Sequence, residues 1–149
     1  MSESKENKMS DVLTMGNQPT GATSNKKVFQ IYPDGPPGEG LKPINVMDLT
    51  KIVAGTAKEI GTFDYIDATR QFTVGIWETP PCTEYIPFYP CDEFCYLITG
   101  GIKLTQSDGT IDHYIAGQGF MVLRGTQCHY EMIGVTKKFS VMFENKLHV

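Results

Sequence analysis

The sequence predicts an all-β fold, either a β-sandwich or a small β-barrel. From residue 63 onward, short apolar segments recur about every ten residues with glycine-containing turns between them, and this spacing is typical of such folds. The 15 glycines and 9 prolines gather in short clusters, which indicates many turns between short elements. The chain has 149 residues. Because a domain usually has about 100–200 residues, we expect one domain.

The N-terminal part of the chain differs from the rest. Residues 1–26 are rich in Ser, Thr, Asn, Gln, Gly and Lys and have little periodic apolar content, so we predict a disordered tail. We assign residues 27–149 to a single barrel domain, in which 27–60 form an N-terminal strand and cover and 61–149 form the barrel core. The alternation in residues 27–32 predicts a strand, and the turn-forming run after it separates this piece from the core, so we expect it to pack on a neighbouring element.

Two segments are apolar at consecutive positions, residues 94–98 and residues 120–123. Successive side chains of a strand point to opposite faces, so both faces of these strands must be covered. A small barrel has only one interior face. The outer face therefore needs a second layer, supplied by residues 27–32 or by a second subunit, and we predict a homodimer.

Charge and hydropathy argue against two classes of partner. The net charge is -4, and Lys and Arg form no cluster larger than a pair such as Lys137-Lys138, so the chain lacks the basic surface that binds a phosphate backbone. No apolar stretch approaches the roughly 20 residues of a membrane span, and residues 1–8 lack the apolar core of a secretory signal. We expect a cytoplasmic protein with no nucleic-acid or membrane partner.

The four cysteines are expected to be thiols, as is usual in a reducing compartment. They are Cys82, Cys91, Cys95 and Cys128. If Cys91 and Cys95 share one strand, their Cα atoms lie about 13 Å apart, which is too far for a disulfide bond.

Glu93 is the first candidate site residue, because it lies in an otherwise apolar β segment, residues 92–98. An ionised carboxylate there is costly unless it is paired, hydrogen-bonded or bound to a metal. Burial beside Phe and Cys should raise the pKa of Glu93 toward the range that is useful for proton transfer, which makes it a candidate general acid or base. The alternative is a carboxylate that forms hydrogen bonds for a structural purpose.

Residues 75–143 resemble the cupin superfamily in their motif spacing. The first cupin motif ends in Glu, six residues and Gly, and Glu93 and Gly100 match this half. The glycines of the second motif are matched by Gly117 and Gly125. The resemblance implies a small cupin-type β-barrel, also called a double-stranded β-helix or jelly roll. Residues 89–94 are most similar to the ethanolamine-utilisation cupins of the EutQ type and to the short, DUF861-like cupins.

The chain departs from the cupin pattern at the positions of the metal-binding histidines. The His-x-His pair of the first motif falls on Pro87 and Tyr89, or on Ile86 and Phe88 with the longer spacing. The histidine of the second motif is replaced by Cys128. The usual three-histidine metal site is therefore absent, we predict no cofactor, and an iron dioxygenase is disfavoured.

Strand alternation predicts which side chains share the interior with Glu93. On its own strand these are Tyr89, Cys91, Cys95 and Leu97. On a second strand they are Cys128, Tyr130 and Met132, which turns His129 outward unless a bulge near Gly125 reverses that strand. The predicted catalytic residues are Glu93, Tyr89 and Tyr130, and the predicted ligand-binding residues are Trp77, Cys91, Cys95, Cys128 and Met132.

A zinc site is an alternative interpretation of the same residues. Thiolates bind zinc well, and residues two apart on a strand have the reach of a His-x-His pair. The ligands would be Glu93 and Cys128, with Cys91 and Cys95 as further thiolates. Against this, buried cysteines are common without any metal.

Three functions remain open at this stage. The first is a small-molecule enzyme that uses Glu93 with Tyr89 or Tyr130 in an isomerase, lyase or cyclase reaction without the standard metal. The second is a ligand-binding barrel without catalysis. The third is a structural or assembly protein of a metabolic pathway, which the EutQ resemblance would allow.

Overall fold

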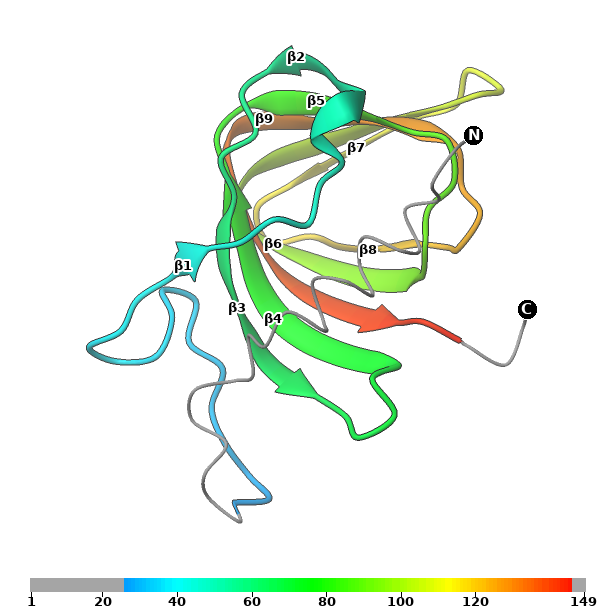
Figure 1. Cartoon of the computed structure of the whole chain (residues 1–149). Helices are drawn as coiled ribbons and strands as arrows, with labels where there is room; N and C mark the ends of the chain where they lie inside the picture. Colours follow the sequence, from blue (N-terminus) through cyan, green and yellow to red (C-terminus); the bar gives the residue numbers. More distant parts are fainter. Residues whose placement is uncertain (1–25, 146–149) are drawn as a thin grey trace.

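A computed structural model describes residues 26–145, so the tail predicted for residues 1–26 lies almost entirely outside the described part of the chain. Strands supply nearly all of the regular structure there, which confirms the all-β class (Figure 1). The elements are β1 (Lys42–Pro43), the 3-10 helix η1 (Leu49–Lys51), β2 (Ile52–Gly55), β3 (Ile60–Ile66), β4 (Phe72–Thr79), β5 (Cys82–Ile86), β6 (Asp92–Gln106), β7 (Ile111–Ile115), β8 (Gly119–Val122) and β9 (Cys128–Phe143).

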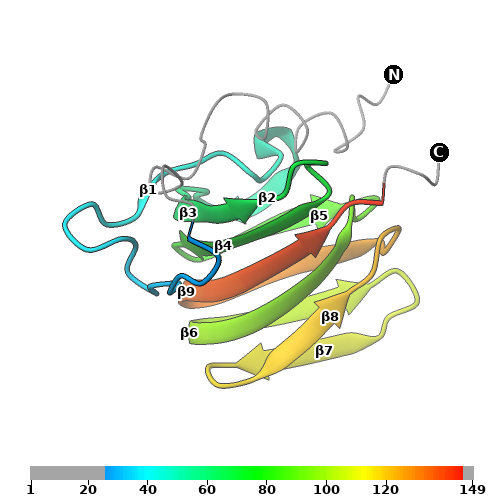
Figure 2. The same ribbon diagram turned by 90° about the horizontal axis from the view of Figure 1, so that it is seen from below.

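Two long antiparallel strands, β6 and β9, belong to both layers of the barrel (Figures 1 and 2). Residues 136–143 of β9 pair with β4, and residues 128–132 pair with β5. The first half of β6 pairs with β8 and the second half with β7. One layer is therefore β1-β3-β4-β9-β6-β8, and the other is β2-β5-β9-β6-β7. This curled arrangement is the predicted jelly roll.

Both long strands bend where they pass from one layer to the other, at Gly100 and Gly134, each with φ of 71°. The register of β6 against β9 shifts beside Gly100. A Cβ at Gly100 would lie 2.5 Å from Thr136 Oγ1 and 2.5 Å from the Val135 carbonyl oxygen. The glycine of the first cupin motif is thus required both by its left-handed backbone and by the close approach of β9.

The N-terminal piece covers one layer but does not form the predicted strand. Residues 27–32 form no strand. Val28 and Phe29 are both exposed, so the alternation of this segment does not separate a buried from an exposed face. The Phe29 ring lies 6.1 Å from the Tyr65 ring on β3, and Asp34 forms an ion pair with Lys137 of β9. The segment therefore lies on the outer side of β3 and β9.

The outer side of β6 and β8 does not receive this cover. Phe94 on β6 is 41% exposed and Met121 on β8 is 53% exposed. Within the described residues, the apolar positions that predicted a second layer therefore remain on the surface. Among residues 26–145, no helix has the length and apolarity needed to cross a membrane.

Candidate functional site

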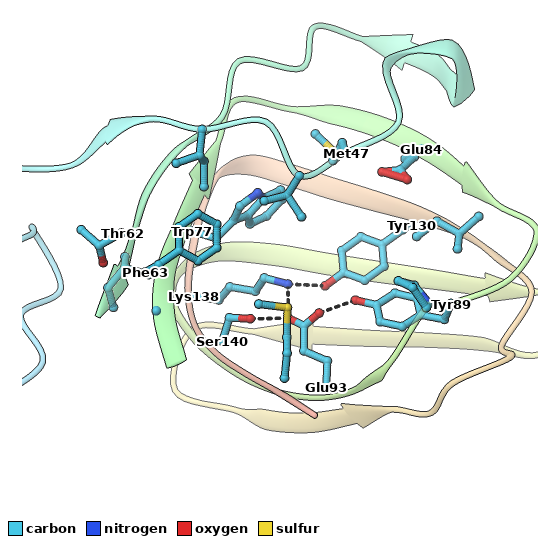
Figure 3. Close-up of a pocket in the computed structure, with 17 residues that line it drawn as sticks. Met47, Thr62, Phe63, Trp77, Glu84, Tyr89, Glu93, Tyr130, Lys138 and Ser140 are labelled. Atoms are coloured by element: carbon cyan, nitrogen blue, oxygen red, sulfur yellow. Dashed lines mark hydrogen bonds and ion pairs between the residues drawn. The ribbon is translucent and has the colours of Figure 1, made fainter. Parts of the chain in front are cut away.

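A pocket opens between the two layers of the barrel, with about 750 Å³ of space when its open mouth is included (Figure 3). Apolar and aromatic side chains form most of its wall, including Met47, Phe63, Trp77, Ile86 and Met142. The polar side chains that face it come mainly from β5, β6, β9 and the segment before β6. They are Thr62, Glu84, Tyr89, Glu93, Tyr130, Lys138 and Ser140.

Glu93 is only 4% exposed and accepts four side-chain hydrogen bonds. Tyr89 donates its hydroxyl hydrogen to Oε1 over 2.6 Å. Three donors reach Oε2: the Cys95 thiol at 3.0 Å, Lys138 Nζ at 2.6 Å and Ser140 Oγ at 2.8 Å. Both carboxylate oxygens are therefore satisfied, as a buried carboxylate requires.

Lys138 connects Glu93 to Tyr130. Its ammonium group donates to the Tyr130 hydroxyl oxygen at 3.3 Å as well as to Glu93. The same Nζ lies 4.8 Å from the centroid of the Trp77 ring and 5.4 Å from that of Tyr130. We call this set of connected side chains the Glu93 network. Its members are Tyr89, Glu93, Cys95, Tyr130, Lys138 and Ser140.

Sequence analysis did not identify Lys138 and Ser140, although a signal was present. On β9 the even-numbered residues face inward, and Cys128, Tyr130 and Met132 are buried while His129 is exposed, as predicted. The same alternation continues through residues 136–142. Extending it along the strand would have placed Lys138 and Ser140 in the interior beside Glu93.

Glu59 is a second residue that sequence analysis missed. Its carboxylate is 6% exposed and accepts hydrogen bonds from the backbone amides of Val46 and Met47 and from Trp77 Nε1, the last at 2.9 Å. Val46 and Met47 form part of the pocket wall. Glu59 therefore fixes both this wall and the orientation of the Trp77 ring.

The comparisons with known proteins agree with this architecture. A family model described as the EutQ-like cupin domain matches residues 66–139. The chain is a cupin of the EutQ-like group. Comparison with curated proteins gave no match.

Solved cupin structures share the fold at low sequence identity. A DUF861-family protein of unknown function from Pseudomonas syringae has 20% identity and a TM-score of 0.63 over 68% of this chain, which spans 43% of that protein. The EutQ protein of Clostridium difficile has 12% identity and a TM-score of 0.52, with 67% of this chain and 81% of that chain covered. The Cnp3 cupin domain of Schizosaccharomyces pombe has 17% identity and a TM-score of 0.51, with 60% and 66% covered.

The pKa of Glu93 in this cupin is lower than its ordinary value, so the expectation of a raised pKa was wrong. Burial does raise it, but the charge and the hydrogen bond of Lys138, together with the hydrogen bonds from Tyr89 and Cys95, outweigh burial. Glu93 is therefore an ionised carboxylate near neutral pH. The sequence prediction failed because it did not include the buried ammonium group.

The partners of Glu93 hold their protons. Burial lowers the pKa of Lys138, whereas Cys95 and Glu93 raise it by a larger amount, so the pKa lies well above its ordinary value. Of these two neighbours, Glu93 is the one that carries a charge at neutral pH. The pKa values of Tyr89 and Tyr130 are raised well above their ordinary value, chiefly because burial disfavours the phenolate. The network thus contains one carboxylate, one ammonium group and two neutral phenols.

The four cysteines of the cupin are buried free thiols, and burial is the main reason that the pKa of Cys91 and that of Cys95 are raised. The structure brings the predicted site residues Trp77, Tyr89, Glu93 and Tyr130 together around the pocket. It places the remaining predicted ligand-binding residues in the packed interior, outside the pocket wall. These are Cys91, Cys95, Cys128 and Met132.

The metal site that cupins often carry does not fit the residues present. Among residues 26–145, no group of three or more His, Cys, Asp or Glu side chains is placed to hold a metal ion. At Glu93 the Lys138 ammonium group lies 2.6 Å from Oε2, where it would repel a metal cation. Deprotonation of Cys95, which a metal would need, is opposed by burial and by the negative charge of Glu93.

Proposed function

We propose that this cupin binds a small molecule and catalyses a proton-transfer reaction of the isomerase, lyase or cyclase type without the three-histidine metal site. The observation that carries the proposal is the division of the Glu93 network into two halves at the pocket. Tyr89 is hydrogen-bonded to the ionised carboxylate of Glu93, and Tyr130 is hydrogen-bonded to the ammonium group of Lys138. Two groups of one chemical type are thus placed in opposite electrostatic environments, as general acid–base catalysis requires.

The first half of the network is suited to remove a proton. The Tyr89 oxygen takes a proton from the substrate while the Tyr89 hydroxyl proton moves to Oε1 of Glu93, over the existing 2.6 Å hydrogen bond. Because Glu93 is ionised, it is the base that receives this proton. In this role Tyr89 and Glu93 act as one unit.

The second half is suited to deliver a proton. Tyr130 donates its hydroxyl proton to a substrate oxygen, and Lys138 transfers a proton to the Tyr130 oxygen, 3.3 Å away. The two phenol rings are stacked with their centroids 6.3 Å apart. A substrate that contacts both hydroxyl groups can therefore lose one proton and gain another without leaving the pocket. These transfers leave Glu93 protonated and Lys138 neutral, and passage of the proton from Glu93 to Lys138, whose Nζ lies 2.6 Å from Oε2, restores the resting state.

A second candidate is a ligand-binding or assembly cupin without catalysis. It is favoured by the four hydrogen bonds that occupy both oxygens of Glu93, because a carboxylate satisfied in this way also serves to fix the barrel interior. Under this alternative the same pocket holds a ligand that leaves unchanged.

We further place this cupin in the cytoplasm as a homodimer. Four buried thiols and no disulfide bond are usual in a reducing compartment. The exposed Phe94 and Met121 on the outer side of β6 and β8 form the proposed dimer contact. Light scattering should give twice the chain mass for the wild type and the chain mass for Met121→Asp. The matched control Ile115→Asp, on the outer side of the other layer, should remain dimeric, and a monomeric wild type contradicts the dimer.

The enzyme and the binding protein are separated by comparing binding with turnover. Compounds that raise the melting temperature in a small-molecule screen are incubated with the protein in deuterium oxide, and proton NMR detects deuterium uptake or a changed product. Glu93→Gln and Tyr130→Phe should abolish turnover, while the outer-face control Tyr96→Phe should retain it. Binding without turnover in the wild type supports the non-catalytic alternative. Turnover that survives Glu93→Gln shows that Glu93 is structural.

Metal analysis of the same protein, purified without chelator, should find far less than one equivalent of zinc.

A further inference from the structure

We propose that the ligand of this pocket is uncharged, with a cyclic, largely apolar body and one carbonyl or hydroxyl oxygen that accepts a hydrogen bond from Tyr130, whose own oxygen accepts from Lys138. This inference rests on the proposed function in that it uses the same pocket and the same proton donor. It goes beyond that function by naming the class of substrate.

The charges that face the pocket disfavour an anion. The lining contains one ammonium group, that of Lys138, and the ionised carboxylate of Glu93. Glu93 already balances Lys138 at 2.6 Å. Tyr130 lies 3.3 Å from Lys138 Nζ, which itself lies 2.6 Å from the ionised carboxylate of Glu93. A ligand carboxylate or phosphate at Tyr130 would therefore lie close to a like charge in a weakly screened interior.

The Trp77 and Tyr130 rings of the pocket already face a cation. Cations bind to proteins over the faces of Trp and Tyr rings. Here the Lys138 ammonium group already lies 4.8 Å from the Trp77 ring and 5.4 Å from the Tyr130 ring. A ligand ammonium group would have to share these faces with a like charge. The protein's own cation therefore occupies this recognition site.

The remaining surface of the pocket matches an apolar ring system. Its walls away from the Glu93 network include Val46, Phe63, Ile86 and Met142. The donor for a ligand oxygen is the Tyr130 hydroxyl group, whose oxygen accepts a hydrogen bond from Lys138 Nζ over 3.3 Å (Figure 3). Small-molecule pockets of this kind, with apolar walls and a few convergent polar groups, bind mostly apolar ligands that are oriented by those groups. One oxygen at one end of the ligand satisfies this arrangement.

Four ligands that share one ring system test the inference: α-tetralone, the hydrocarbon tetralin, a tetralin carboxylate and an aminotetralin in its ammonium form. Equilibrium dialysis at neutral pH gives a dissociation constant for each. The ketone should bind at least about tenfold more tightly than either charged analogue, and more tightly than tetralin by about tenfold, the usual value of a buried hydrogen bond. Equal or tighter binding of a charged analogue overturns the inference, as does failure of α-tetralone to bind.

The position of the ligand oxygen is tested with Tyr130→Phe, which removes one hydroxyl group from the pocket. This variant should bind tetralin as the wild type does and should lose the preference for the ketone, whereas Tyr96→Phe should keep it. An unchanged preference in Tyr130→Phe overturns the assignment of the oxygen to Tyr130. Unchanged tetralin binding also shows that the pocket of the variant is intact.

Failure of this inference and failure of the proposed function give different results. The dissociation constants do not depend on turnover. If the protein prefers the ketone through Tyr130 but turns over none of the compounds that bind, the inferred ligand class is supported and the proposed catalysis is rejected. Tight binding of the tetralin carboxylate rejects the inference of an uncharged ligand. The catalytic role of Glu93 is still decided by deuterium uptake in the compounds that bind.

Discussion

Lys138 and Glu93 are separated by 45 residues in the sequence, yet Lys138 Nζ lies 2.6 Å from Glu93 Oε2 inside the barrel. The two residues come from β9 and β6, the strands that both layers share. Their pairing explains why two charged side chains, 7% and 5% exposed, are tolerated in the interior. It also joins the two phenols of the pocket through one ion pair.

Removal of one partner of this ion pair should destabilise the protein more than removal of both. Lys138→Met leaves a buried carboxylate without its counter-charge, and the free energy of unfolding should fall by about 3–5 kcal/mol. The double variant Glu93→Gln/Lys138→Met should recover a large part of this loss. Urea unfolding of the wild type and the variants measures the effect. A double variant that is less stable than Lys138→Met alone would contradict the account of the pair.

The contribution of the ion pair should depend on pH at both extremes. The pKa of Glu93 is lower in the folded protein, so its contribution is complete above the unfolded-state pKa of about 4.3 and is lost as the pH falls through the folded-state pKa. The pKa of Lys138 is higher in the folded protein, so its contribution is complete below about pH 10.4 and is lost as the pH rises through the folded-state pKa.

The double variant Glu93→Gln/Lys138→Met provides the reference for this pH dependence, because neither of its substituted side chains titrates. The difference in unfolding free energy between the wild type and this variant should be constant between about pH 5 and pH 10 and should fall on either side. A difference that grows toward acid pH would show that the assigned shift of Glu93 has the wrong sign.

Gly100→Ala should be among the most destabilising single-methyl changes in the chain. Gly100 has a φ of 71°, and a Cβ would lie 2.5 Å from the Val135 carbonyl oxygen, so the variant combines a strained backbone with a clash against β9. Gly109→Ala is the matched control, because Gly109 has a φ of 88° but a Cβ added there would have no atom within 4 Å. Strain alone costs about 1 kcal/mol. We expect Gly100→Ala to lose clearly more stability than Gly109→Ala in urea unfolding, and equal losses would argue against the close approach.

Strand alternation in the sequence predicted which side chains face the interior, but it did not predict which residue of another strand pairs with each of them. The recurrence of short apolar segments, with the spacing of Glu93, Gly100, Gly117 and Gly125, predicted the barrel, and the apolar neighbours of Glu93 predicted the interior position of its carboxylate. The interior location of Tyr130 followed from alternation on a single strand. The lowered pKa of Glu93 could not be predicted from alternation, because it depends on Lys138. A lysine in a strand is normally on the surface, so no buried ammonium group was expected.

The strand predicted for residues 27–32 was wrong for a related reason. A strand needs a neighbouring edge as well as an alternating pattern, and sequence periodicity reports only the second. The pocket wall formed by Val46 and Met47 could not be predicted from the sequence either. It is held by Glu59, more than ten residues away, and no local pattern records that contact.

Glu59→Gln should change the environment of Trp77, the only tryptophan in the chain. Trp77 Nε1 donates to Glu59, and the substitution weakens this charge-assisted hydrogen bond as well as those to Val46 and Met47. We expect a red-shifted fluorescence maximum and stronger quenching by acrylamide. Glu131→Gln, on the partly exposed side of β9, is the control and should leave the spectrum unchanged. An unaltered spectrum in Glu59→Gln would show that Glu59 does not orient the indole ring.

The sharing of β6 and β9 between the two layers has a consequence for how the protein opens. Amide hydrogens in either half of these strands are protected by ladders that run through the same two backbones. Detachment of one layer would therefore fray the other. In native-state hydrogen exchange, the slowest amides on both sides of the Gly100 bend should exchange together, with a single free energy equal to that of global unfolding.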